Sequence, residues 1–96
     1  MRVDTLVKDK RADILRIAAQ YGAHDVRVFG SVVRGEADDR SDVDLLVAFD
    51  LDVTLLRHAA LARELEGLLG CRVDVVSDRG LRPRVRERVL REAVAL

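Results

Sequence analysis

The sequence predicts an α+β fold in which a small mixed β-sheet of three or four strands carries helices mainly on one face. Stretches with helical spacing of apolar residues alternate along the chain with shorter runs rich in Val, Leu and Phe. Glycines and polar turns separate these stretches. Ninety-six residues suffice for one modest core, so residues 1–96 are expected to form a single domain.

The first helix is predicted from about Asp4 to Tyr21, where apolar residues recur at helical spacing and Gly22 follows as a stop signal. Tyr21 ends the apolar stripe and is interpreted as a core residue rather than a base-stacking group or a modification target. Residues 26–29 are predicted to form the first strand.

Residues 28–47 carry the pattern with the clearest chemical meaning. A strand ends in Gly30-Ser31, a short turn and a polar loop follow, and a second strand opens on Asp42 and Asp44. Beyond these acids the second strand is apolar at successive positions, which predicts a central strand buried on both faces. The loop acids Asp38 and Asp39 are interpreted as solvated turn residues.

The second strand predicts a metal site. Side chains alternate along a strand, so Asp42 and Asp44 project from the same face with Cα atoms roughly 6.5–7 Å apart. Two carboxylates held so closely repel unless a cation lies between them, and hard oxygen ligands suit Mg²⁺ or Mn²⁺. A pair of such ions can hold the attacking and leaving oxygens of a phosphoryl displacement.

The end of the first strand predicts a phosphate site. Gly30 lets the backbone approach an anion closely, and Ser31 can cap the following turn. Free N–H groups at the start of a helical turn favour negative charge. Together the two halves fit a nucleoside triphosphate bound with its metal ions.

With these residues the sequence resembles the DNA polymerase beta-like nucleotidyltransferase superfamily, specifically its minimal nucleotidyltransferase (MNT) branch. The family signature is Gly-Ser, ten intervening residues, then Asp-x-Asp, and here Gly30-Ser31 precedes Asp42-Val43-Asp44 at that spacing. Val33 is a conservative departure from a common Ala. The longer family pattern is matched at Arg34, Gly35, Ser41 and Leu45.

The resemblance implies a nucleotidyltransferase fold, ATP as the expected substrate and two divalent ions as cofactors. It assigns the triphosphate to Gly30 and Ser31. Arg34 is expected to contact phosphate, the alternative being an ion pair with Asp38 or Asp39.

The next helix is predicted over residues 52–69, capped by Asp52 and ended by Gly70. His58 within it is interpreted as a surface or boundary residue. Residues 71–76 are predicted to form the third strand, and its Asp74 is either a strand-end acid paired with an arginine or a third site carboxylate. Element order favours the site, and the resemblance implies that Asp74 binds metal and accepts a proton.

A C-terminal helix is predicted over residues 81–96, with Pro83 near its start. Arg84, Arg88 and Arg91 form a stripe along it. Such stripes are usually solvated faces, and contact with an acidic partner or RNA is the alternative.

Composition restricts the functional classes. The sequence has zero formal net charge, so direct nucleic-acid binding is not expected. Cys71 is the only cysteine and the longest apolar runs are far shorter than a membrane span, so the expectation is a cytoplasmic protein without membrane contact.

The resemblance also implies a biological role. MNT domains of this size are often antitoxins encoded beside HEPN-domain ribonuclease toxins, which they silence by transferring AMP to a toxin tyrosine. The sequence leaves no residues for an acceptor-binding domain, so a protein partner is expected. A small-molecule nucleotidyltransferase of the aminoglycoside type and a non-catalytic antitoxin that acts by binding stay open as alternatives.

Overall fold

The computed structural model describes residues 3–38 and 41–96 and has the predicted α+β architecture. Its sheet has four strands in the order β3-β2-β1-β4. The central strand β2 (Val43–Phe49) runs antiparallel to β1 (Ala23–Phe29) and parallel to β3 (Val73–Ser77). The short edge strand β4 (Val94–Ala95) pairs antiparallel with β1. The sheet is therefore mixed.

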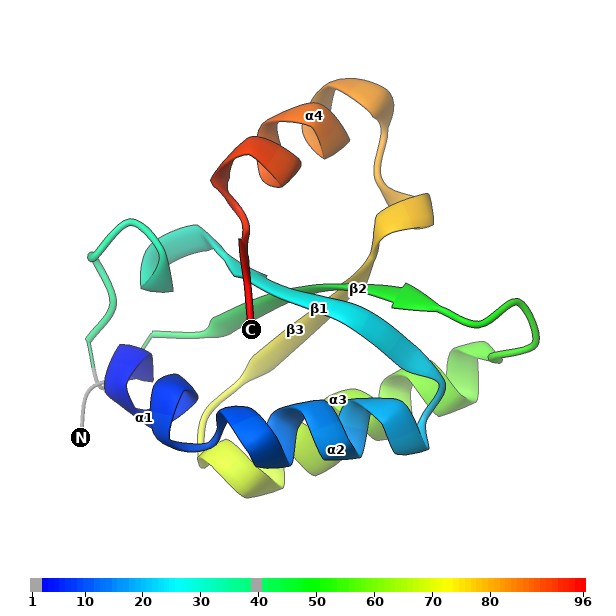
Figure 1. The fold of residues 1–96 in the computed structure, drawn as a ribbon, viewed down its shortest axis with the longest axis horizontal. Coiled ribbons are helices and arrows are strands. Elements are labelled where there is room, and N and C mark those ends of the chain that lie inside the picture. Colours follow the sequence, from blue (N-terminus) through cyan, green and yellow to red (C-terminus); the bar gives the residue numbers. More distant parts are fainter. Residues whose placement is uncertain (1–2, 39–40) are drawn as a thin grey trace.

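Helices cover the two faces of the sheet unequally. Three helices lie below the sheet in Figure 1: α1 (Val3–Asp9), α2 (Arg11–Gln20) and α3 (Leu55–Leu69). The remaining helix, α4 (Pro83–Glu92), lies above it. Two short 3₁₀ turns, η1 (Gly30–Val32) and η2 (Asp78–Gly80), follow β1 and β3.

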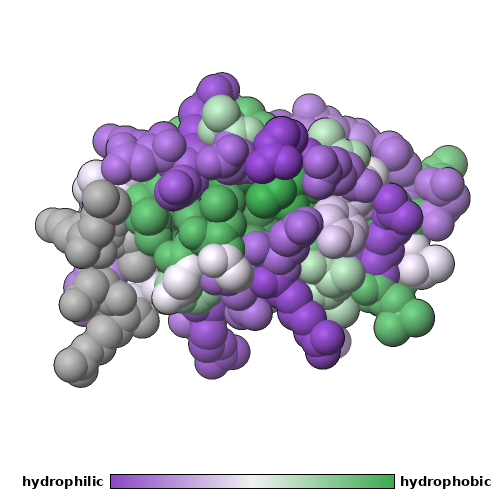
Figure 2. All heavy atoms as spheres, turned by 90° about the horizontal axis from the view of Figure 1, so that it is seen from below, coloured by the Kyte–Doolittle hydropathy of each residue, from purple (hydrophilic) through white to green (hydrophobic). Residues whose placement is uncertain are grey.

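The main core lies between the sheet and the three lower helices. Ile14 and Leu61 are fully buried there, as are Val43, Leu45 and Val47 from one face of β2. Side chains alternate along a strand, so Asp44 and Leu46 point to the opposite face, towards α4. Seen from the helical side, the protein shows hydrophilic side chains around a central apolar area (Figure 2).

Several boundaries differ from the sequence prediction. The predicted helix over residues 4–21 is two helices that meet at Lys10, where no glycine or proline marks the break. The first strand begins three residues earlier than predicted. A register irregularity between His24 and Arg27, with Asp25 at φ +50°, interrupts the alternation of side chains from which a strand is predicted. The third strand is shifted to residues 73–77.

The predicted cap of the middle helix was wrong. Thr54, not Asp52, caps α3, because its side-chain oxygen accepts a hydrogen bond from the backbone N–H of Arg57 at 3.2 Å. Gly70 ends the helix in the left-handed conformation, as predicted.

The predicted C-terminal helix over residues 81–96 ends early, at Glu92. Pro83 occupies its first turn as expected, but Ala93 is extended and the chain continues as β4. β4 pairs Val94 with Val28 and Ala95 with Arg27, so it occupies backbone groups at the edge of β1. This pairing returns the end of α4 to the sheet.

Candidate active site

The Gly30-Ser31 pair lies where β1 turns into η1. Gly30 has φ +77°, a left-handed conformation that favours glycine. A Cβ atom at this position would overlap Asp44 Oδ2. Gly30 therefore brings the predicted phosphate-binding turn into direct contact with one of the predicted metal-binding acids, and half-buried Ser31 follows it in the turn.

The three predicted acids converge on two neighbouring strands. Asp44 and Asp74 are register partners in the parallel pair β2–β3, and Asp42 immediately precedes β2. Burial is the main cause that raises the pKa of Asp44, and the negative charges of Asp74 and Asp42 raise it further. Asp42 and Asp74 are exposed, whereas Asp44 is half-buried. No arginine pairs with Asp74 within the described part of the chain.

This donor set suits a hard divalent cation. Three carboxylates whose charges oppose one another would be stabilised by a cation, and oxygen ligands are those that Mg²⁺ prefers. In the conformation described, no group of three His, Cys, Asp or Glu side chains among residues 3–38 and 41–96 is already gathered tightly enough to hold a metal ion. The side chains of Asp42, Asp44 and Asp74 would therefore have to turn towards an ion that they share.

Arg34 faces the same turn but has different partners from those considered in the sequence. Its Nε donates to Glu36 Oε2 at 3.1 Å, and its Nη1 donates to Glu92 Oε1 at 2.8 Å. Arg34 thus pairs with Glu36 and Glu92, and the alternative partner Asp39 lies outside the described residues.

Glu92, at the end of α4, belongs to the site and was missed in the sequence. Its Oε2 accepts a hydrogen bond from the backbone N–H of Gly30 at 3.1 Å. The hydrogen bond from Arg34 is the largest cause that lowers the pKa of Glu92, and the Gly30 hydrogen bond adds to it. No local sequence pattern marks this glutamate, because its position depends on the pairing of β4 with β1.

These groups line a cavity of about 440 Å³, here called the site cavity. α4 contributes Arg88, so one member of the predicted arginine stripe reaches the candidate site. Ser31, Asp42 and Asp74 do not line the cavity. Ser31 follows the lining residue Gly30 in the chain, and Asp42 and Asp74 are neighbours of the lining residue Asp44 in the chain and in the sheet. The lining residues are Phe29, Gly30, Arg34, Asp44, Arg88, Val89 and Glu92.

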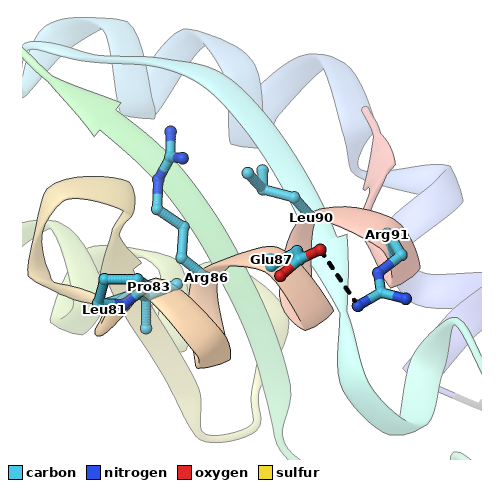
Figure 3. A pocket seen from close by; sticks show the side chains of 6 residues that line it. All are labelled: Leu81, Pro83, Arg86, Glu87, Leu90 and Arg91. Atoms are coloured by element: carbon cyan, nitrogen blue, oxygen red, sulfur yellow. Dashed lines mark ion pairs between the residues drawn. The ribbon is translucent and has the colours of Figure 1, made fainter.

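A separate hollow of about 480 Å³ lies along α4 away from the acids. Figure 3 shows Leu81, Pro83 and Leu90 in this hollow, together with the ion pair between Arg91 and Glu87, whose atoms are 3.6 Å apart. It contains none of the predicted site residues. The stripe is therefore divided, because Arg88 lines the site cavity and Arg91 lines this second hollow, while Arg84 is exposed elsewhere on the helix.

Two residues set aside in the sequence have structural partners. His58 is half-buried, with its Nε2 atom 2.6 Å from the carbonyl oxygen of Val75 and its ring 4.7 Å from that of Phe49, which confirms it as a boundary residue. Tyr21 is half-buried against the core, and the Arg57 guanidinium lies 5.7 Å from its ring centre.

Comparison with known proteins identifies the family. Residues 11–96 match the nucleotidyltransferase domain family. The chain belongs to this family. It is 47% identical over 75 residues to protein adenylyltransferase MntA of Thermococcus cleftensis, a match that covers 78% of this chain and 76% of that protein. The described helices include none long and apolar enough to cross a membrane.

Solved structures agree with this assignment. One described as a minimal nucleotidyltransferase is 58% identical, with a TM-score of 0.88 over 100% of this chain and 97% of that chain. The MNT antitoxin of Shewanella oneidensis, solved in complex with its tri-AMPylated HEPN toxin, shares the fold at 20% identity, with a TM-score of 0.68 over 96% of this chain and 70% of that chain. The nucleotidyltransferase fold and enzyme class are thus confirmed, and the family in general uses ATP and divalent metal ions.

Proposed function

We propose that this protein is an antitoxin that transfers AMP from ATP to a tyrosine of a HEPN-domain ribonuclease toxin. One observation carries the proposal: Gly30 holds the phosphate-binding turn directly against Asp44, beside the register pair Asp44–Asp74. A triphosphate on this turn would have its reacting phosphorus close to the acids.

The residues divide the work in the proposed reaction. Gly30 and Ser31 bind the triphosphate through backbone and hydroxyl groups, and Arg34 contacts a phosphate oxygen. Asp42, Asp44 and Asp74 would hold two Mg²⁺ ions, for which Mn²⁺ could substitute. When bound, these ions would neutralise charge on the phosphate oxygens and on the leaving group.

The transfer step is a displacement at the α-phosphorus. The acceptor hydroxyl oxygen forms a bond to this phosphorus, the bond to the bridging oxygen of the β-phosphate breaks, and pyrophosphate leaves with the electron pair. Asp74 accepts the hydroxyl proton. The exposed position of Asp74 at the site edge suits contact with an acceptor carried by another protein.

The HEPN partner is proposed from relatives. A protein adenylyltransferase is 47% identical to this chain, and a neighbour of the same fold is an MNT antitoxin bound to an AMPylated HEPN toxin. We place the reaction in the cytoplasm, where ATP is available and a lone Cys71 stays reduced.

Mass spectrometry of a partner protein tests the proposal. A HEPN-domain toxin supplied as partner and incubated with this protein, ATP and Mg²⁺ is expected to gain the mass of AMP on a tyrosine, and its toxicity on co-expression is expected to be relieved. Asp42→Asn combined with Asp44→Asn should leave the partner unmodified. Rescue by this double variant, with no adduct in either case, would leave only a binding antitoxin.

The small-molecule alternative is tested in the same preparation. If the partner stays unmodified while an aminoglycoside gains AMP in an Mg²⁺-dependent reaction, the acceptor is a small molecule and the protein-transfer proposal is wrong.

A further inference from the structure

The nucleotide-binding turn already holds a carboxylate. The Gly30 N–H and Arg34 Nη1 donate to the two oxygens of Glu92, at 3.1 and 2.8 Å. A carboxylate bridging a backbone N–H and a guanidinium makes the hydrogen bonds that a phosphate group would make with the same donors. We call these two donors the anion seat.

Glu92 is held at the anion seat by sheet pairing. Glu92 is the last residue of α4, and β4 follows it after Ala93, pairing Val94 with Val28 and Ala95 with Arg27. The backbone N–H of Leu96 also donates to the carbonyl oxygen of Val26, in the same register. The contacts of Val94, Ala95 and Leu96 with β1 therefore hold the end of α4, and with it the Glu92 backbone, close to Gly30.

The Glu92 side chain can nevertheless leave. It is 26% exposed, faces a site cavity of about 440 Å³ and has three rotatable bonds. Once it rotates away, the cavity presents the Gly30 N–H together with Arg34 and Arg88, and Arg88 lies one helical turn before Glu92. The vacated seat then attracts anions.

We infer that the Glu92 carboxylate occupies the place of a substrate phosphate in the nucleotide-free protein, so that ATP binds only by displacing it. This inference rests on the proposed nucleotide site and names a residue that sets its affinity. Because only molecules with the seat vacated accept the triphosphate, competition with Glu92 raises the apparent dissociation constant for ATP. When nucleotide is absent, Glu92 keeps Arg34 and the Gly30 N–H paired.

Calorimetric titration with two probes, MgATP and metal-free inorganic tripolyphosphate, tests the inference. The Glu92→Ala variant should bind each probe about tenfold more tightly than the wild type does. The affinity of Glu92→Gln should lie between those of the wild type and Glu92→Ala, because glutamine keeps the shape of the side chain without its charge. The matched control is Glu87→Ala, which removes an exposed glutamate from the same helix, outside the site cavity. It is expected to leave both dissociation constants unchanged.

Four results would overturn the inference. Weaker binding by both Glu92 variants, with thermal unfolding unchanged, would make Glu92 a support or metal ligand of the site. An equal gain in affinity from Glu87→Ala would show that the tighter binding comes from the change in net charge alone. Binding of ATP by the wild type without tightening in the Glu92 variants would remove the inference alone, whereas absence of ATP and tripolyphosphate binding in every variant would remove the proposed nucleotide site with it.

Discussion

The two faces of β2 differ in what they contribute to the protein. On the face towards α2 and α3, Val43, Leu45 and Val47 are at most 1% exposed and join the main core. On the opposite face, Asp44 lies beside Asp74 and beneath the turn at Gly30. Burial of apolar surface stabilises the fold at roughly 25 cal/mol per Å², while convergent carboxylates oppose it.

This difference explains how a small protein keeps an unfavourable charge cluster in place. Adjacent residues of β2 have different roles, because the alternation of side chains places Leu45 in the core and Asp44 in the candidate site. Packing on the core face holds the strand in place and so positions the acids on the other face. Substitutions on the two faces should therefore affect different properties.

The largest expected effect is on activity from the site face. Asp44→Asn should reduce AMP transfer at least about a thousandfold, equivalent to about 4 kcal/mol of transition-state stabilisation. The fold should persist, because removing one of three like charges relieves repulsion. Rates with labelled ATP, beside circular dichroism spectra, check this; normal Mg²⁺-dependent transfer would contradict the assignment of the acid.

The neighbouring residue should show the reverse pattern. Leu45→Ala removes a fully buried side chain and is expected to lower the free energy of unfolding by about 3 kcal/mol. Below its unfolding temperature, the variant should retain most of its transfer rate. Denaturant unfolding and rate measurements at low temperature check both parts, and a stable but inactive variant would show that the two faces are not separable.

Glycines in the same segment give a matched comparison. Gly30→Ala should lower ATP affinity by about tenfold, because its Cβ would overlap Asp44 and its φ of +77° is unfavourable for alanine, costing roughly 1–2 kcal/mol. Gly35 has a similar φ of +73° but open space around a Cβ. Gly35→Ala should therefore show the strain in thermal unfolding while leaving ATP affinity nearly unchanged. Equal loss of affinity would attribute the effect to backbone strain alone.

A smaller effect is expected from the residue that follows. Ser31→Ala should weaken ATP binding about threefold, since it removes one hydroxyl contact and keeps the backbone donors, a loss of under about 1 kcal/mol. Calorimetric titration measures this. Unchanged ATP affinity in both Ser31→Ala and Gly30→Ala would show that the nucleotide does not bind at this turn.

The smallest effect concerns pH. The pKa of Asp44 is raised by burial and by Asp74 and Asp42, so its contribution to stability is present when it is protonated and is lost as pH rises through the raised pKa. Metal-free Asp44→Asn should thus exceed the wild type in stability at pH 7, by less than about 1 kcal/mol, and the difference should close near pH 4. Addition of Mg²⁺ and ATP should reverse the order at pH 7, because only the wild type gains stability from binding. Thermal unfolding across pH checks the sign.

Much of the architecture could be predicted locally. Gly70 and Pro83 mark helix ends by backbone chemistry, and the apolar run after Asp44 identified the central strand. The break at Lys10, the start of β1 and the cap of α3 could not be placed, because no strong local signal distinguishes them from their neighbours.

The sequence by itself determined the family and the central pair of motifs, because Gly30-Ser31 and Asp42-Val43-Asp44 are close in the chain and their spacing is fixed by one turn and one strand. Only the tertiary structure decided that Glu92 and Arg88 join them. Both lie more than fifty residues after Gly30, and their position follows from the register of β4 on β1. Register is set by pairing between distant segments, which a local pattern of residues does not encode.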